Sequence, residues 1–144
     1  MLTTNQKGAL AEAKIAAAAI EAGIVVARPL EAGRYDLIFD LGERLLRIQC
    51  KWAARRGGVL VIRCRGCRRG REGLIHRAYE PGEIDGIAAY CRDLDQTYLL
   101  PVELSCRRAV VQLRLSPARN NQFAGINWAR DFELAATLGR ILGP

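Results

Sequence analysis

Three polar side chains in the first half of the chain have the types and spacing that metal-assisted chemistry needs: Asp36, Gln49 and Lys51. A hard cation such as Mg²⁺ prefers oxygen ligands and keeps several waters. Asp36 and the amide oxygen of Gln49 could supply two ligands, and the backbone carbonyl of Cys50 is a candidate third. Such a cation stabilises charge on a phosphate and activates water, and Lys51 could position that water or offset negative charge. The alternative is a half-exposed hairpin with ordinary polar residues.

Glu12 is a fourth candidate. On a helix its neighbours three and four residues away are Gly8, Ala9, Ile15 and Ala16, which are all small or apolar. A lone carboxylate is costly to bury among such residues, and small neighbours would let the helix approach a sheet closely. The alternative is a carboxylate at the edge of the stripe that pairs with Lys or Arg.

A predicted hairpin would position the first three residues. Strands are expected at 35–41 and 44–52, joined by a tight turn at residues 42–43. The turn sets a register in which Leu37 faces Ile48, and the apolar residues of both strands then share one face. The same register places Asp36 opposite Gln49, with Cβ atoms roughly 5 Å apart, and directs Lys51 to the same side.

The remaining elements follow from local patterns. Thr3 and Gln6 have the spacing of a capping box, and a helix should run from there to Ala22 and stop at Gly23. Strands are expected at 59–64, 98–104 and 109–115, helices at 83–91 and 127–142, a Gly/Arg-rich loop at 65–73 and a polar loop at 117–122. This order predicts one α/β domain over residues 1–144, with a mixed sheet flanked by helices and built on a largely antiparallel meander.

The charge of the chain favours a polyanionic partner. The net charge is +7, and 19 of the 22 basic residues are arginines, whose planar donors suit phosphates and guanine edges. The expected partner is a nucleic acid. The alternatives are a solvated basic loop for the Arg-rich stretch and an ordinary polar turn for residues 119–122. The candidate DNA-binding residues are Arg55, Arg56, Arg68, Arg69, Arg71, Arg114, Arg119, Asn120, Asn121 and Gln122.

The cysteines indicate a reducing environment. Their number, five, is odd, and no signal peptide or membrane span is predicted, so a cytoplasmic protein with free thiols is expected. Cys64 and Cys67 form a single C-X-X-C motif. A structural zinc usually needs two such pairs, so free thiols are favoured over zinc.

The run KGALAEAKIAAAAIEAGIVVARPLEAGRYDLIFDLGERLLRIQCKWA resembles the core of the PD-(D/E)XK nucleases. It is most similar to the intron-encoded homing endonucleases of that type, and more distantly to archaeal Holliday-junction resolvases. The later runs YEPGEID and LRLSPARNNQ extend the likeness. The family pattern assigns Glu12 as the acid on the helix, Asp36 as the acid on the first strand, and Gln49-Cys50-Lys51 as the acid-X-Lys motif.

Two positions depart from the family pattern. Tyr35 stands where the family often has Pro, and Gln49 replaces the usual acid. The homing subgroup uses Gln at that position, although the amide leaves one fewer negative charge for a metal.

The resemblance implies a restriction-endonuclease-like fold and a Mg²⁺- or Mn²⁺-dependent endonuclease that cuts double-stranded DNA, site-specifically as homing enzymes do. Asp36, Gln49 and the Cys50 carbonyl would hold the metal, with Glu12 acting through a water. A duplex cutter needs two active sites, so a homo-oligomer, dimer or tetramer, is expected. The alternatives are a junction resolvase and a DNA-binding protein of the same fold that has lost catalysis.

Overall fold

The computed structural model describes residues 1–70, 73–80, 82–117, 120 and 124–143, and for residues 66–70 and 73–77 it describes the backbone alone. The helices are α1 (Thr4–Glu21), α2 (Val102–Ser105), the 3-10 helix η1 (Ala129–Phe132) and α3 (Leu134–Leu142). The strands are β1 (Val25–Ala27), β2 (Leu37–Asp40), β3 (Leu45–Arg56), β4 (Val59–Arg63), β5 (Arg65–Gly70), β6 (Gly73–Ala78), β7 (Gly86–Cys91), β8 (Gln96–Pro101) and β9 (Val110–Arg114).

Helix α1 begins and ends where the sequence predicts. The Thr3 hydroxyl accepts a hydrogen bond from the Gln6 N–H at 3.1 Å, and the Gln6 side chain accepts one from the Thr3 N–H at 2.9 Å. Both bonds of the capping box are therefore formed. Gly23 follows the helix with φ 86°, a left-handed conformation that favours glycine. Among the helices that the structure describes, none is long and apolar enough to cross a membrane.

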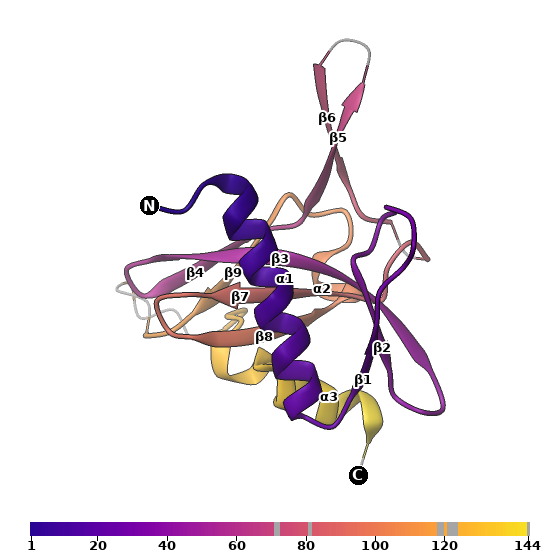
Figure 1. Ribbon diagram of the computed structural model, residues 1–144. Helices are drawn as coiled ribbons and strands as arrows, with labels where there is room; N and C mark the ends of the chain where they lie inside the picture. Colours follow the sequence, from indigo (N-terminus) through magenta and orange to yellow (C-terminus); the bar gives the residue numbers. More distant parts are fainter. Residues whose placement is uncertain (71–72, 81, 118–119, 121–123, 144) are drawn as a thin grey trace.

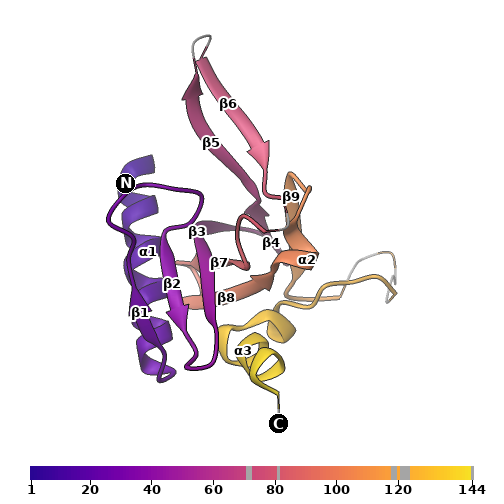
Figure 2. The same ribbon diagram turned by 90° about the vertical axis from the view of Figure 1, so that its right-hand side faces the viewer.

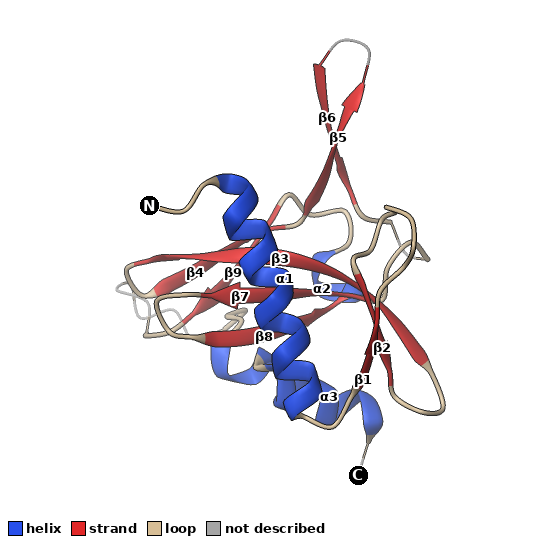
Figure 3. Cartoon of the chain, viewed as in Figure 1, coloured by secondary structure: helices blue, strands red, loops and turns tan. Residues whose placement is uncertain are grey.

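Strand β3 is the axis of the sheet. β2 pairs with its first part and β4 with its last part, both antiparallel, while β7 runs parallel to its middle. β1, β8 and β9 extend the sheet beyond β2, β7 and β4 respectively. The mixed sheet flanked by helices is confirmed, and Figure 3 shows α1 crossing the sheet diagonally.

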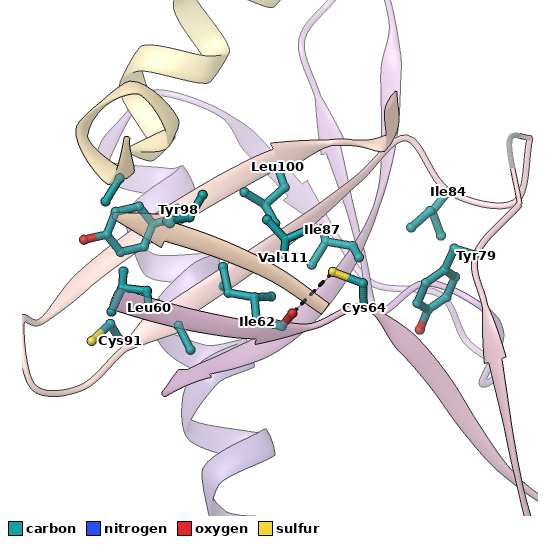
Figure 4. Close-up of a cluster of buried hydrophobic side chains, with 14 residues drawn as sticks. Leu60, Ile62, Cys64, Tyr79, Ile84, Ile87, Cys91, Tyr98, Leu100 and Val111 are labelled. Carbon is teal, nitrogen blue, oxygen red and sulfur yellow. Dashed lines mark hydrogen bonds between the residues drawn. The ribbon is translucent and has the colours of Figure 1, made fainter. Parts of the chain in front are cut away.

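Two apolar cores lie along β3. One packs α1 and α3 against β2 and the first half of β3, and includes Ile15, Phe39 and Ile48. The other joins β4 and β9 to β7 and β8 (Figure 4), and its members from β3 and β4 include Ala53 and Leu60. Successive strand residues point to opposite faces, so Ile48 and Ala53 lie on opposite faces of β3. Cys50 therefore packs against the first core, whereas Gln49 and Lys51 are on the same face of β3 as Ala53.

The helix predicted at 83–91 is wrong, because most of this segment is strand β7. All six residues of β7 are buried, with the sequence GIAAYC. Such a continuous apolar run is the pattern of a parallel strand covered on both faces, and periodicity alone does not distinguish it from a buried helix. Its glycine also suits the strand: a Cβ at Gly86 would lie 3.0 Å from the Leu100 carbonyl oxygen.

The loop predicted at 65–73 is also wrong. β5 and β6 form an antiparallel hairpin, from the pair Arg65–Ala78 to the pair Gly70–Gly73. Pairing satisfies the backbone groups of a segment whose sequence offers little apolar surface. Figures 1 and 2 show this hairpin projecting from the rest of the molecule. The predicted C-terminal helix is divided into η1 and α3.

Candidate active site

The Asp36 carboxylate is attached to the backbone of β3. Its Oδ2 accepts a hydrogen bond from the Cys50 N–H at 2.9 Å. The regular pairing of β2 with β3 ends at Leu37 and Ile48. Beyond that point the Asp36 side chain takes the place that a backbone carbonyl of β2 would occupy. This contact fixes the Asp36 carboxylate at the edge of β3, beside Cys50, the residue that precedes Lys51.

The predicted register is confirmed from Leu37 to Asp40 but not at Asp36. The Asp36 N–H donates to the Ile48 carbonyl at 2.8 Å, although Leu37 is already the register partner of Ile48. Two residues that oppose one are the pattern of a bulge. The expected direct pairing of Asp36 with Gln49 is therefore corrected: the carboxylate is turned toward Cys50.

Glu12 lies beside the buried face of α1, which includes Ala11 and Ile15, and its side chain is 26% exposed. Arg28, which follows β1, forms an ion pair with it at 3.0 Å. This pair matches the alternative in which Glu12 lies at the edge of the apolar stripe, since Ile15 is buried and Gly8 and Ala9 are exposed. Arg28 was not among the predicted site residues, because a partner from another element leaves no local signal.

The Cys50 thiol is partly buried, next to the Asp36 carboxylate that its N–H binds. Burial raises the pKa of Cys50, and the negative charges of Asp36 and then Glu12 raise it further, while Arg28 opposes them. A thiol in this environment keeps its proton. The structure therefore brings together Glu12 from α1, Asp36 from the start of β2, and Cys50 from β3.

Lys51 is held where the β5–β6 hairpin leaves the sheet. Its Nζ donates to the Arg65 carbonyl at 3.0 Å, and it lies 5.7 Å from the centre of the Tyr79 ring. Gln49 is partly buried on the same strand, with Ile87 as its parallel partner on β7. Because strand residues alternate, Gln49 and Lys51 share one face of β3, as predicted.

Tyr79, which lies beside Lys51, and Arg34, which lies over the Tyr79 ring, were missed from the sequence. Tyr79 is 1% exposed at one end of the second core (Figure 4). The Arg34 guanidinium lies 4.1 Å from its ring centre, and Arg34 also pairs with Glu83 at 2.8 Å. Burial raises the pKa of Tyr79 to about 12, so its hydroxyl stays protonated at neutral pH.

The profile of the PD-(D/E)XK endonuclease family matches residues 2–135. The chain belongs to the PD-(D/E)XK endonuclease family. A solved structure titled as that of a bacterial homing endonuclease, I-Ssp6803I, matches with a TM-score of 0.72 and 24% sequence identity, and the match covers 97% of each chain. At that identity the likeness shows a shared fold. No curated protein sequence matches the chain.

The DNA-binding residues predicted for this PD-(D/E)XK endonuclease fall into two groups, those that the structure describes and those outside the described residues. Arg55, Arg56, Arg114 and Asn120 are described, and of these Arg55, Arg56 and Asn120 are exposed. Arg114 donates to the Ser116 and Pro117 carbonyls, each at 3.1 Å. Arg71, Arg119, Asn121 and Gln122 lie outside the described residues, as do the side chains of Arg68 and Arg69.

A zinc role for the C-X-X-C motif is not supported by Cys64. This residue is fully buried, and its Sγ contacts the Ile62 carbonyl at 3.5 Å (Figure 4). Burial raises its pKa to about 11, which disfavours the thiolate that a metal requires. The side chain of Cys67 lies outside the description. Within the described residues, no group of three or more His, Cys, Asp and Glu could hold a metal ion.

Proposed function

We propose that this member of the PD-(D/E)XK family is a Mg²⁺- or Mn²⁺-dependent endonuclease that cuts double-stranded DNA at a specific sequence, as homing enzymes do. The observation that carries the proposal is the hydrogen bond from the Cys50 N–H to the Asp36 carboxylate. That bond orients an acid at an open strand edge, and Gln49 and Lys51 flank its donor.

The donor atoms at this edge suit a hard cation. In a strand, the N–H and C=O of one residue point to the same neighbour, so the Cys50 carbonyl points toward the edge where Asp36 lies. Together with the amide oxygen of Gln49, these groups form an all-oxygen set, which matches Mg²⁺ better than a softer metal. The described His, Cys, Asp and Glu side chains do not by themselves form a metal-binding group. The proposed ligand set therefore depends on the Gln49 amide oxygen and the Cys50 carbonyl oxygen in addition to Asp36.

Each residue then has a distinct role. Asp36, Gln49 and the Cys50 carbonyl would hold the cation, which supplies charge stabilisation and water activation when bound. Glu12 would accept hydrogen bonds from a water of that cation. Lys51 would donate to a phosphate oxygen and offset negative charge as the phosphodiester bond breaks.

The homing-type assignment is supported by the 97% coverage of a structure titled as a bacterial homing endonuclease. Cutting both strands of a duplex requires two active sites. The proposed protein therefore acts as a homo-oligomer on DNA, with symmetry-related copies of this site.

The test is cleavage of a library of supercoiled plasmids with random inserts, in Mg²⁺, Mn²⁺ or EDTA, followed by sequencing of the cut ends. Linearisation at one shared sequence in either metal, with none in EDTA, supports the proposal. Cutting of four-way junctions in preference to linear duplexes would indicate a resolvase. Tight DNA binding with no cleavage in either metal would indicate a protein that has lost catalysis.

A further inference from the structure

A basic cleft begins at Lys51 and runs over the outer face of β3 and β4. Its volume is about 660 Å³, and its cationic lining residues are Lys51, Arg56, Arg63 and Arg65. Trp52, Val61 and Val110 are its larger apolar lining residues. Within the described part of the chain, no carboxylate lines this cleft. Such a lining is complementary to a polyanion with partly apolar surfaces.

Strand alternation produces this outer face. On β4, Leu60 and Ile62 are fully buried in the second core, so the side chain of Arg63 points away from that core and is exposed. On β9, Val111 and Leu113 are buried in the same way. The outward residues are therefore displayed by a paired, rigid sheet and not by a loop.

A second hollow continues the same face along β9. Its volume is about 360 Å³, and Arg108, Gln112 and Arg114 line it. Val110, which is 42% exposed, belongs to both hollows and joins them. Among the described residues that line the second hollow there is again no acid. The two hollows together form a basic surface that leads from Lys51 to Arg114.

We propose that this outer face of β3, β4 and β9 holds the DNA backbone on one side of the phosphate that is cut. This inference rests on the proposed function, because it takes Lys51 to mark the scissile phosphate. Arg56 and Arg63 neutralise successive phosphates, and the apolar floor at Val61 and Val110 accommodates deoxyribose.

Charge is the reason for choosing DNA over a protein partner. Arginine is also common at protein interfaces, but this cleft is lined by four cations and, among its described residues, by no acid. An excess of one charge sign suits the repeated negative charge of a phosphate backbone. The continuity with Lys51 also favours the substrate over a separate ligand. Bound backbone would enter the candidate active site directly from the cleft.

The test compares two double variants in binding assays with EDTA present, so that no DNA is cut. One variant combines Arg56→Ala with Arg63→Ala. The matched control combines Arg44→Ala with Arg92→Ala, which are exposed arginines in the β2–β3 and β7–β8 connections. The cleft variant should reduce the slope of log K against log salt by about 1.8, or 0.9 for each lost phosphate contact. The control should leave the slope unchanged.

Phosphate ethylation interference then locates the lost contacts. With the wild-type protein, interfering phosphates should include a contiguous set on one side of the cut, and the cleft variant should lose members of that set. An unchanged salt slope for the cleft variant, with normal cleavage by the wild-type protein, overturns this inference and leaves the proposed function intact. The opposite result is a wild-type protein that never cuts DNA and a cleft variant whose salt slope is reduced. That result would overturn the proposed catalysis and leave the proposed DNA-binding surface intact.

A fluorescence measurement separates local contact from an effect on folding. In a Trp128→Phe background, Trp52 is the single tryptophan, and DNA bound in the cleft should quench its emission. The cleft variant should keep the emission spectrum of the free protein and lose the quenching at equal DNA concentration. Full quenching without Arg56 and Arg63 would contradict the proposed location of the backbone.

Discussion

At the scale of single residues, the site depends on a side chain that replaces a backbone group. Asp36 accepts from the Cys50 N–H through its carboxylate, at the point where β2 leaves β3. The bond uses one oxygen of the carboxylate and orients the group as a whole. It also offsets part of the desolvation free energy of a carboxylate beside the partly buried Cys50 thiol. An acid there is structurally anchored before any metal binds.

Lys51→Ala should abolish DNA cleavage and leave DNA binding nearly unchanged. Lys51 is the cation of the proposed motif, and loss of one electrostatic stabiliser typically costs about 10²–10³ in rate. The measurement is plasmid cleavage together with binding in EDTA. Lys14→Ala, on the exposed side of α1, is the control and should cut normally. Near wild-type cleavage by the Lys51 variant would remove this residue from the mechanism.

Gln49→Glu should fold normally and bind Mg²⁺ or Mn²⁺ more tightly, because a carboxylate is a stronger ligand for a hard cation than an amide. Gln49→Ala should bind the metal more weakly than the wild type. Titration calorimetry with each metal measures both effects. Equal affinity in all three proteins would show that Gln49 is not a ligand.

At the scale of secondary-structure elements, an ion pair joins the two parallel strands beneath the site. Asp85 precedes β7, and its Oδ2 accepts from the Arg47 N–H at 2.7 Å and from the Arg47 Nε at 3.1 Å. Arg47 also donates to the Gly82 carbonyl. These bonds align β7 with β3 just before Gln49. The pairing supports the strand that carries the proposed ligands.

Asp85→Asn should lower the free energy of unfolding by about 1–2 kcal/mol at pH 7. Burial alone would raise the pKa of Asp85, but the hydrogen bonds and charge of Arg47 outweigh it and lower the pKa. A lowered folded-state pKa stabilises the protein above the unfolded value, about 3.9, and this stabilisation is lost as the pH falls through the folded value.

The difference between wild type and Asp85→Asn should therefore be constant from pH 7 to pH 5 and shrink below about pH 4. Urea unfolding across this range measures it. Asp93→Asn, an exposed residue in the turn after β7, serves as the control. A difference that stays constant down to pH 2 would show that the negative charge of Asp85 does not contribute to the stability of the protein.

At the scale of the whole molecule, the site, the basic face and the hairpin lie around one strand. Lys51 contacts the Arg65 carbonyl at the base of the β5–β6 hairpin and also lines the basic cleft. Figure 2 shows the hairpin extending away from the sheet on which the site lies. DNA in the cleft would therefore pass close to the hairpin, whose sequence is rich in arginine.

The protein should form at least a dimer, because one active site cuts one strand and a duplex has two. Sedimentation velocity, with and without cognate duplex, measures the assembly. Mixing wild-type subunits with Lys51→Ala subunits should produce nicked plasmid as a major product. A strict monomer in both conditions would contradict the two-site arrangement, as would complete linearisation by the mixed preparation without a nicked intermediate.

Local sequence patterns determined α1 and the β2–β3 hairpin. The capping box, the glycine stop and the two-residue alternation involve neighbours in the chain, so their physical causes are present in any short window. Gln49 and Lys51 became site candidates because strand alternation places them on one face, whereas the direct pairing predicted for Asp36 with Gln49 was wrong. The acid-X-Lys spacing then led to the family that the profile confirms.

Tertiary structure decided what depends on distant partners. A run such as GIAAYC is compatible with a helix or a strand until β3 pairs with it and both faces are covered. The bulge at Asp36 occurs together with the hydrogen bond from the Cys50 N–H, and Glu12 pairs with Arg28 from another part of the chain. The surroundings of Lys51, with Tyr79 and the Arg65 carbonyl, arise where the hairpin leaves the sheet. Contacts between residues far apart in the chain have no local periodicity, so only the folded arrangement specifies them.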